Sequence, residues 1–376
     1  MKKIFFGLLA ILTLFACQPK VNTAGLDPDQ FKDNVHGKQT ALYTLKNANG
    51  MEVCITNFGG RIVSILVPDR DGKMRDVVLG FDNIKDYENI PTDFGACIGR
   101  YANRINQGRI TIDGVEYQLL TNNYGHTLHG GPTGWQYQVY EAEQTGDNML
   151  RLTLLSEDGD NGFPGNVTAG CSYTLTDDNA IRMEYFATTD APTVINMTNH
   201  AYFNLHGDGN QSILDHHLWL NAKQMTPVDS TFMTTGEIRD IQPGTPFDFL
   251  TEPKPVGQDI DAEDIQLQNG HGYDHNWVLL PREDCEELLL AATLFCPETG
   301  IKLSVLTNEP GIQVYAGNFL DGTVVGKRGE VYGRRHAICL ETQKYPDTPN
   351  KPDWPSALLR PGETYSSTTV FQFGVE

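Results

Sequence analysis

The sequence has little positive charge. It holds 28 lysine and arginine residues against 48 aspartate and glutamate residues, which gives a formal net charge of −20 at pH 7. Proteins that bind a nucleic-acid backbone need clustered lysine and arginine to neutralise its phosphates. The charge balance therefore argues against a nucleic-acid partner, whereas binding of a neutral small molecule does not depend on the net charge.

The chain also lacks the motifs of several common enzyme classes. It has no G-x-S-x-G segment that would hold a nucleophilic serine, and it has neither a Walker loop nor a dinucleotide-binding fingerprint. Paired-cysteine spacings of the zinc type are missing as well. These absences disfavour acyl, phosphoryl and hydride transfer, and they lead us to expect no bound metal.

The longest apolar run lies at the N-terminus. Lys2 and Lys3 precede an apolar segment over 4–15, which is too short to cross a bilayer as a mature helix. A charged start followed by such a run is typical of a secretory signal. The run ends in residues 14–17 (LFAC), which resemble the lipobox of bacterial lipoproteins.

We therefore predict a signal peptide over 1–16, a lipid on Cys17 and a flexible polar tether over 17–36. The lipid would anchor the protein to a membrane, in the periplasm or on the outer membrane. Cleavage of the signal without lipidation is the alternative.

The six remaining cysteines lie mostly in apolar, strand-like stretches, so buried free thiols are expected. An exported protein can also form disulfides. If one forms, Cys285 with Cys296 is the pair that neighbouring strands would favour.

Period-two alternation recurs along the chain, while helical periodicity is weak. The stretch 109–117 holds two alternating segments around Asp113-Gly114, a strong hairpin signal. Asn49-Gly50 and Asp71-Gly72 separate further pairs of strand-like segments in the same way. Strands this numerous predict an all-β fold, a large antiparallel β-sandwich. No linker, composition shift or repeat divides 37–376, which we interpret as one catalytic domain.

Several polar clusters place ionisable groups inside strand-like sequence. They are 99–105 (GRYANRI), 127–131 (TLHGG), 196–205 (NMTNHAYFNL), 272–276 (GYDHN) and 339–343 (CLETQ). Taken singly, each has a structural explanation, such as a turn residue, a hydrogen-bonded core histidine or an ion pair. Glu341 is harder to explain in this way, because a carboxylate in an apolar strand is costly to bury unless it is paired. Taken together, the clusters supply a candidate base, a candidate acid, an arginine and several hydrogen-bonding groups, which suits proton transfer on a neutral polyol.

These segments closely resemble those of the aldose 1-epimerase (galactose mutarotase) family, in the same order and over nearly all of the mature chain. Residues 310–320 (PGIQVYAGNFL) and 345–347 (YPD) also resemble family segments. The resemblance implies a β-supersandwich with a sugar-binding groove. It also implies that Glu341 is the general base and His200 the general acid.

Further residues are expected to bind the sugar. The resemblance implies this role for Asn103, Arg104, His129, Asp274 and Gln313. Tyr202 lies two residues beyond His200, so it would point to the same sheet face and help to line the groove. His275 would face the opposite way.

The implied reaction interconverts the α and β anomers of a free aldose such as glucose or galactose. A carboxylate near the anomeric hydroxyl and an imidazolium near the ring oxygen can open and close the ring by paired proton transfers. Such chemistry needs no cofactor, although some bacterial members of the family bind calcium. We expect the protein to act on the sugar as a monomer.

Three alternatives stay open from the sequence. A non-catalytic carbohydrate-binding lipoprotein on the same fold would have no need for both Glu341 and His200. A hexose-phosphate epimerase would need more cationic groups than Arg100 and Arg104 supply. A glycosidase usually needs two carboxylates, a pair that Asp274 and Glu341 could provide.

Overall fold

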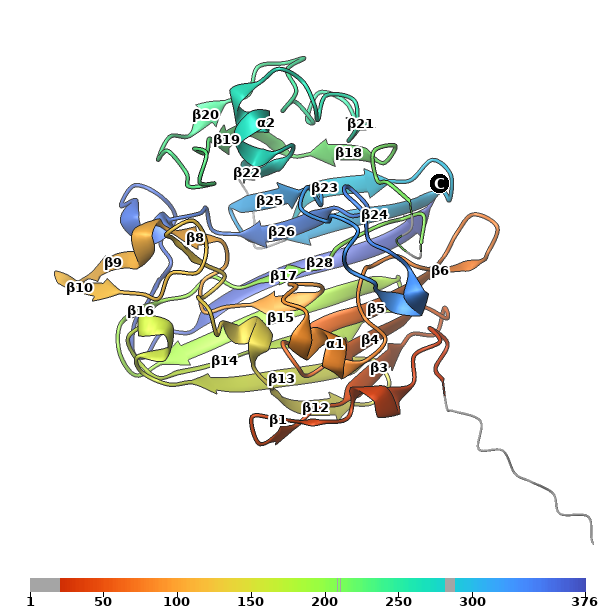
Figure 1. Cartoon of the computed structure of the whole chain (residues 1–376), viewed down its shortest axis with the longest axis horizontal. Helices are drawn as coiled ribbons and strands as arrows, with labels where there is room; N and C mark the ends of the chain where they lie inside the picture. Colours follow the sequence, from red (N-terminus) through yellow and green to blue (C-terminus); the bar gives the residue numbers. More distant parts are fainter. Residues whose placement is uncertain (1–20, 208, 210, 281–287) are drawn as a thin grey trace, which may run out of the picture.

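The computed structural model describes residues 21–207, 209, 211–280 and 288–376 (Figure 1). Within them the fold is built on a nine-stranded antiparallel sheet, in which β28 near the C-terminus lies between β15 and β24. In spatial order its strands are β12 (Glu141–Thr145), β13 (Met149–Ser156), β14 (Val167–Leu175), β15 (Ala180–Thr189), β28 (Tyr365–Val375), β24 (Ile301–Thr307), β23 (Leu289–Phe295), β18 (His217–Leu220) and β21 (Lys254–Pro255).

Two smaller antiparallel sheets accompany it. One has the order β20 (Arg239–Asp240), β19 (Ala222–Thr226), β22 (Asp274–Leu279), β25 (Gly311–Tyr315) and β26 (Cys339–Gln343). The other has the order β3 (Leu42–Lys46), β4 (Glu52–Thr56), β5 (Arg61–Pro68) and β6 (Met74–Asp76).

Short two-stranded ladders and helices complete the described part of the chain. The ladders are β1 (Asn34–Val35) with β2 (Lys38–Gln39), β7 (Ala96–Ile98) with β17 (Thr198–His200), β8 (Arg104–Ile105) with β11 (Thr127–Leu128), β9 (Arg109–Ile112) with β10 (Val115–Gln118), and β16 (Thr193–Val194) with β27 (Leu358–Leu359). The α-helices are α1 (Ile84–Asn89) and α2 (Ile265–Gly270), and 3₁₀ turns lie at Pro28–Phe31, Asn106–Gly108, Trp135–Tyr137, Asp160–Gly162, Lys327–Gly329 and Thr348–Asn350.

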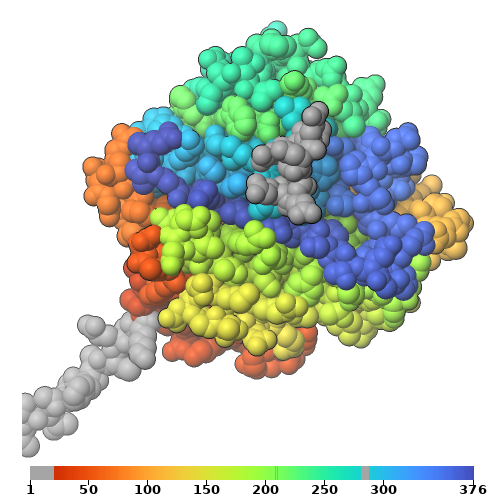
Figure 2. Space-filling model, turned by 180° about the vertical axis from the view of Figure 1, so that it is seen from behind, coloured from red at the N-terminus to blue at the C-terminus, as the bar shows by residue number. Residues whose placement is uncertain are grey.

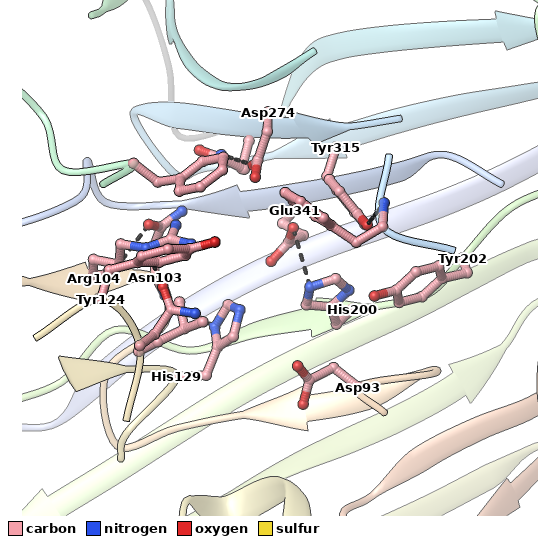
Figure 3. Close-up of a pocket in the computed structure, with 15 residues that line it drawn as sticks. Asp93, Asn103, Arg104, Tyr124, His129, His200, Tyr202, Asp274, Tyr315 and Glu341 are labelled. Carbon is pink, nitrogen blue, oxygen red and sulfur yellow. Dashed lines mark hydrogen bonds and ion pairs between the residues drawn. The ribbon is translucent and has the colours of Figure 1, made fainter. Parts of the chain in front are cut away.

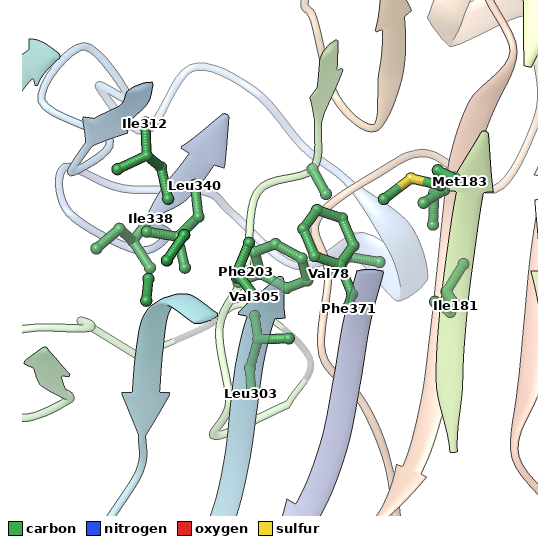
Figure 4. Packing of buried hydrophobic residues seen from close by; sticks show 14 of the residues in the cluster. Val78, Ile181, Met183, Phe203, Leu303, Val305, Ile312, Ile338, Leu340 and Phe371 are labelled. Atoms are coloured by element: carbon green, nitrogen blue, oxygen red, sulfur yellow. The ribbon is translucent and has the colours of Figure 1, made fainter. Parts of the chain in front are cut away.

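The core lies between the nine-stranded sheet and the smaller sheets. Figure 4 shows Leu303 and Phe371 of the large sheet near Ile312 and Leu340 of the five-stranded one, and all of them belong to one buried cluster. Strands such as β13 and β24 alternate between buried and more exposed side chains, so their other face is turned to solvent. The view from behind shows this outer side, where yellow, green, dark blue and light blue regions follow one another in the order of the strands in the sheet (Figure 2). The predicted antiparallel β-sandwich is confirmed.

The hairpins predicted from Asn-Gly and Asp-Gly pairs are confirmed as well. Asp113-Gly114 joins β9 to β10, with Ile112 paired to Val115. Asn49-Gly50 lies between β3 and β4, and Asp71-Gly72 lies between β5 and β6. Local turn chemistry therefore set the register of these strands.

The predicted tether over 17–36 requires a correction. From residue 21 it is described, and it is packed against the sandwich: Leu26 and Phe31 are buried with residues of β4 and β5. The Glu52 carboxylate accepts a hydrogen bond from the backbone N–H of Ala24. Apolar side chains spaced through a polar segment anchor it, so the folded part begins well before residue 37.

Cys54, Cys97, Cys171, Cys296 and Cys339 are buried free thiols, as predicted. The signal peptide, Cys17 and Cys285, and with Cys285 the suggested Cys285–Cys296 pair, lie outside the described residues. Among the helices of the described residues, none has the length and apolar character needed to cross a bilayer.

Candidate active site

A cavity of about 320 Å³ opens where the five-stranded sheet meets the β7–β17 and β8–β11 ladders (Figure 3). Its lining combines ionisable, amide and aromatic side chains. They are Asp93, Asn103, Arg104, Asn123, Tyr124, Leu128, His129, His200, Tyr202, Phe232, Asp274, Gln313, Tyr315, Phe319 and Glu341.

Strand register builds one wall of this cavity. Gln313 of β25 lies directly opposite Glu341 of β26, and Asp274 of β22 lies opposite Tyr315. Because side chains alternate across a strand, these residues share one face of the sheet while Ile312 and Leu340 enter the core on the other. Strand β26 is thus buried on both faces.

Long-range pairing builds the opposite wall. In the β7–β17 ladder His200 is the partner of Ala96, and the backbone N–H of Gly95 donates to the carbonyl of His200. This brings Asp93, three residues before Ala96, to the same end of the cavity as His200. Arg61 fixes the segment, since its guanidinium donates to the backbone carbonyls of Thr92 and Phe94 on either side of Asp93.

The third side of the cavity comes from the β8–β11 ladder and the tight turn that follows it. Leu128 pairs with Arg104 in the β8–β11 ladder, which sets His129 beside Asn103. The chain turns at Gly130, which has φ +80°, and a Cβ there would lie 2.2 Å from the carbonyl oxygen of Gly99. Only glycine meets both demands, so the Leu-His-Gly-Gly segment seen in the sequence serves to present His129.

The predicted base and acid meet in this cavity. Nε2 of His200 lies 3.5 Å from Oε1 of Glu341, and both side chains are almost fully buried. Burial raises the pKa of Glu341 well above its ordinary value, with Asp274 and Asp93 adding to the rise and Arg104 opposing it. Burial lowers the pKa of His200, and Asp93 opposes this. The two shifts make the carboxylate a stronger base and the imidazolium a stronger acid.

Charges flank this pair on both sides. The negative charge of Asp93 favours the protonated form of His200, and the positive charge of Arg104 favours the ionised form of Glu341. The predicted roles of Glu341 as base and His200 as acid need those two forms together. Asp93 thus opposes the effect of burial on His200, and Arg104 opposes it on Glu341, where Asp274 and Asp93 add to it.

His129 is held as a neutral hydrogen-bond donor. Its Nδ1 accepts a hydrogen bond from the backbone N–H of Asn103 at 3.1 Å, so the ring proton belongs on Nε2. Burial lowers the pKa of His129 well below its ordinary value, and His200 and Arg104 lower it further. Its ring lies edge-on to that of His200, with centroids 5.2 Å apart.

Two further polar groups are positioned by neighbours. Gln313 donates from Nε2 to Oδ1 of Asp274 at 2.7 Å, which orients the carboxylate in the cavity. Nε of Arg104 donates to Asn123, and its guanidinium lies over the ring of Phe232 at 4.9 Å. Burial lowers the pKa of Arg104 and raises that of Asp274, while their mutual attraction favours the charged form of each.

Aromatic rings give the cavity apolar surface. Tyr202 stacks on His200 with ring centroids 5.0 Å apart, as the period-two argument placed it. Tyr315 stacks on Phe319, and its hydroxyl accepts from the backbone N–H of Phe319. Such rings pack well against the C–H faces of a pyranose, while the polar groups between them can bind hydroxyls.

One set of atoms in the cavity has the spacing of a metal site. Asp93, His129 and His200 each offer an atom within 4.8 Å of the others. Two imidazoles do not suit calcium, which takes oxygen ligands. His200 is also the predicted acid, so a cation here would compete with its proton.

The structure thus brings every predicted catalytic and sugar-binding residue to one cavity, and His275 packs on the other face against Phe247. Four residues that line the cavity were not predicted from the sequence: Asp93, Phe232, Asn123 and Tyr124. The last two lie beside Arg104. Tyr315 could have been found, because it belongs to the family-like segment 310–320. Asp93 carried no local signal, since the β7–β17 pairing alone brings it to His200.

Comparison with known proteins agrees with this arrangement. The family model described as aldose 1-epimerase matches residues 41–372. Galactose mutarotase from Rattus norvegicus is 42% identical over 325 residues, covering 86% of this chain and 92% of its own. The chain belongs to the aldose 1-epimerase family. The resemblance seen in the sequence motifs is confirmed.

Other members of the aldose 1-epimerase family match over similar lengths. Aldose 1-epimerase from Escherichia coli (strain K12) is 39% identical over 358 residues, covering 94% of this chain and 99% of its own. An aldose epimerase homologue from C. elegans has a TM-score of 0.82 at 32% identity and covers 89% of this chain and 99% of its own. Galactose 1-epimerase from Lactobacillus acidophilus has a TM-score of 0.79 at 28% identity, covering 91% and 97%.

Proposed function

We propose that this protein interconverts the α and β anomers of free aldoses, with Glu341 as general base and His200 as general acid. The observation that carries the proposal is the convergence of these two side chains, 3.5 Å apart, in one polar and aromatic cavity of sugar size. Family membership supports the same activity.

The reaction follows from the placement of the two groups. Glu341 removes the proton from the anomeric hydroxyl, the bond from C1 to the ring oxygen breaks, and His200 gives its proton to that oxygen. Rotation about C1–C2 turns the other face of the aldehyde to the ring hydroxyl. On closure the ring hydroxyl gives its proton back to His200, and the aldehyde oxygen takes the proton that Glu341 holds. Atoms and charge therefore balance over the cycle.

The remaining groups stabilise the sugar and the charge that develops on it. Nε2–H of His129 and the guanidinium of Arg104 face the cavity and can donate to an oxygen that becomes negative. Asp274, held by Gln313, can accept from a sugar hydroxyl. Asn103 accepts from the backbone N–H of Arg104 through its Oδ1, and this bond fixes the turn that carries both residues.

Polarimetry on freshly dissolved α-glucose, α-galactose and a disaccharide tests the proposal. We expect mutarotation well above the buffer rate, and a loss of about 10²–10⁴-fold for Glu341→Gln and for His200→Asn. The exposed residues Glu237 and His36 provide matched controls, because Glu237→Gln and His36→Asn make the same chemical changes outside the cavity.

The opposite result would assign a different role. Wild-type protein that leaves every aldose at the buffer rate while binding it would be a carbohydrate receptor on this fold. Full activity in Glu341→Gln would mean that another group acts as base.

The proposed chemistry calls for no cofactor, because Glu341 and His200 supply and accept both protons. The wild-type rate is therefore expected to survive exhaustive dialysis against a chelator. A loss of activity that calcium alone restores would contradict this.

We also propose that the protein is a lipoprotein of the periplasm or outer membrane, anchored through Cys17. The charged start, the apolar run and the lipobox-like residues 14–17 support this. Such a location would suit an enzyme that handles sugars released from polysaccharide. Membrane fractionation of wild type and Cys17→Ala tests the anchor, and an unchanged distribution would refute it.

The enzyme is further proposed to act as a monomer, since the cavity described above is built from elements of one chain. Sedimentation of active protein at the concentration of the assay checks this.

A further inference from the structure

A second cluster of ionisable side chains lies where β18 and β23 meet. In their ladder His217 pairs with Phe295, so His216 and Cys296 are neighbours at the end of the two strands. His206, from the segment that follows His200, joins them. None of these residues lines the sugar cavity.

The contacts around His206 are specific. Its Nδ1 lies 3.5 Å from Sγ of Cys296 and 3.2 Å from Oε2 of Glu298. Its Nε2 lies 2.9 Å from Oδ1 of Asp215, and the same oxygen lies 2.9 Å from Nδ1 of His216. Nε2 of His216 accepts a hydrogen bond from the backbone N–H of Leu205.

These contacts determine where the protons sit. Because Nε2 of His216 is an acceptor, its ring proton lies on Nδ1 and is donated to Asp215. Asp215 can also accept the Nε2 proton of His206. Nδ1 of His206 therefore faces Cys296 and Glu298, on the side of the ring away from Asp215.

We propose that Cys296, His206 and Glu298 form a binding site for one zinc-class divalent cation, with Sγ, Nδ1 and a carboxylate oxygen as its protein ligands. Zinc lies about 2.3 Å from sulfur and about 2.0–2.2 Å from nitrogen or oxygen, so tetrahedral ligands are separated by about 3.6 Å for sulfur–nitrogen and about 3.4 Å for nitrogen–oxygen. The two separations from Nδ1, 3.5 Å and 3.2 Å, fit this geometry.

The surroundings suit such a site. Asp215 binds the far nitrogen of His206, which is the carboxylate–histidine–metal arrangement that orients metal ligands in proteins. Cys296 and His206 are buried, whereas the side chains of Glu298 and Asp215 are 58% and 50% exposed. A cation can therefore enter from the carboxylate side, and water can complete its coordination.

A thiolate and an imidazole select a zinc-class ion over calcium. The bound ion would join the β23–β24 turn to the segment that runs from His200 to β18. Its expected effect is therefore on stability, and the sugar reaction itself does not depend on it.

Cobalt(II) is the probe for the test. We expect the metal-free protein to bind one cobalt ion with the near-ultraviolet thiolate-to-cobalt band and the visible bands of a four-coordinate site. Cys296→Ser should remove the thiolate band, while Cys54→Ser, a buried thiol elsewhere, should keep it. Asp215→Asn should weaken binding by about 10–100-fold.

A second measurement covers the case in which Cys296→Ser does not fold. Glu298 is exposed, so Glu298→Gln should leave the fold and the mutarotase rate unchanged while lowering zinc affinity and the rise in melting temperature that zinc produces. The proposal is overturned if wild type shows no thiolate band with equimolar cobalt, or if Cys296→Ser retains the band. The first result would mean that His206 is held only by hydrogen bonds and ion pairs with its neighbours, and the second that another thiol binds the cobalt.

Discussion

A carboxylate oxygen of Asp93 lies within 4.8 Å of an imidazole nitrogen of His200. Arg61 positions Asp93 without contacting its carboxylate, because the guanidinium hydrogen-bonds the backbone carbonyls on both sides of it. The carboxylate therefore faces the cavity. Asp93 therefore acts on the predicted acid through its charge.

Asp93→Asn should shift the whole pH–rate profile to lower pH. The negative charge of Asp93 raises the pKa of His200 and also that of Glu341, so its removal lowers both. The acid then loses its proton at lower pH, and the base becomes ionised at lower pH. The pH dependence of kcat/KM measures the shift.

Asp71→Asn serves as the control for this prediction, since it makes the same change at an exposed turn. A profile that falls in height without moving along the pH axis would mean that Asp93 has a structural role only.

Arg104→Met should move only the limb of the profile that Glu341 sets, and it should move it to higher pH. The guanidinium lowers the pKa of Glu341, so its loss raises that pKa, and the carboxylate stays protonated to higher pH. Arg104→Lys keeps the charge and should restore the limb, although it loses the planar stacking over Phe232. Two limbs that move together in Arg104→Met would contradict the assignment.

Asp274→Asn should weaken sugar binding more than it slows turnover. A hydrogen bond to a charged group contributes about 1.5–3 kcal/mol, so its loss is expected to raise KM roughly tenfold or more. Initial rates over a range of sugar concentrations give KM and kcat separately. Asp353→Asn on the surface is the control, and an unchanged KM in Asp274→Asn would remove Asp274 from the sugar-binding groups.

Phe371→Ala should destabilise the sandwich by about 3–5 kcal/mol. Phe371 is 1% exposed and packs edge-on to Phe203 with centroids 5.0 Å apart, so truncation leaves a cavity in the core. Urea unfolding measures the loss. Leu155→Ala, at a position 61% exposed, should change stability by less than about 0.5 kcal/mol, and an equal loss in both variants would contradict this account of the core.

The features that the sequence predicted well depend on local chemistry or on family motifs. Asp113-Gly114 formed its hairpin because both residues suit the tight turn between β9 and β10. Glu341 and His200 were expected together because the motifs around them match the family, and the β25–β26 and β7–β17 ladders carry them to one cavity.

The features that were missed depend on contacts between distant segments. Asp93 reaches His200 only through the β7–β17 ladder. The cluster around His206 joins three segments whose spacing matches no short motif. The stretch 21–36 was predicted to be a flexible polar tether, because two apolar residues, Leu26 and Phe31, are too few to give a periodic pattern. Their burial is nevertheless enough to hold the stretch against β4 and β5.

Strand β26 sets a limit on how this enzyme can be redesigned. Leu340 is part of the core and Glu341, its neighbour, faces the sugar cavity, so repacking around Leu340 changes the position of the proposed catalytic carboxylate. Engineering for heat resistance would therefore do better to target the outer face of the nine-stranded sheet, where side chains can be exchanged without displacing Glu341 or His200.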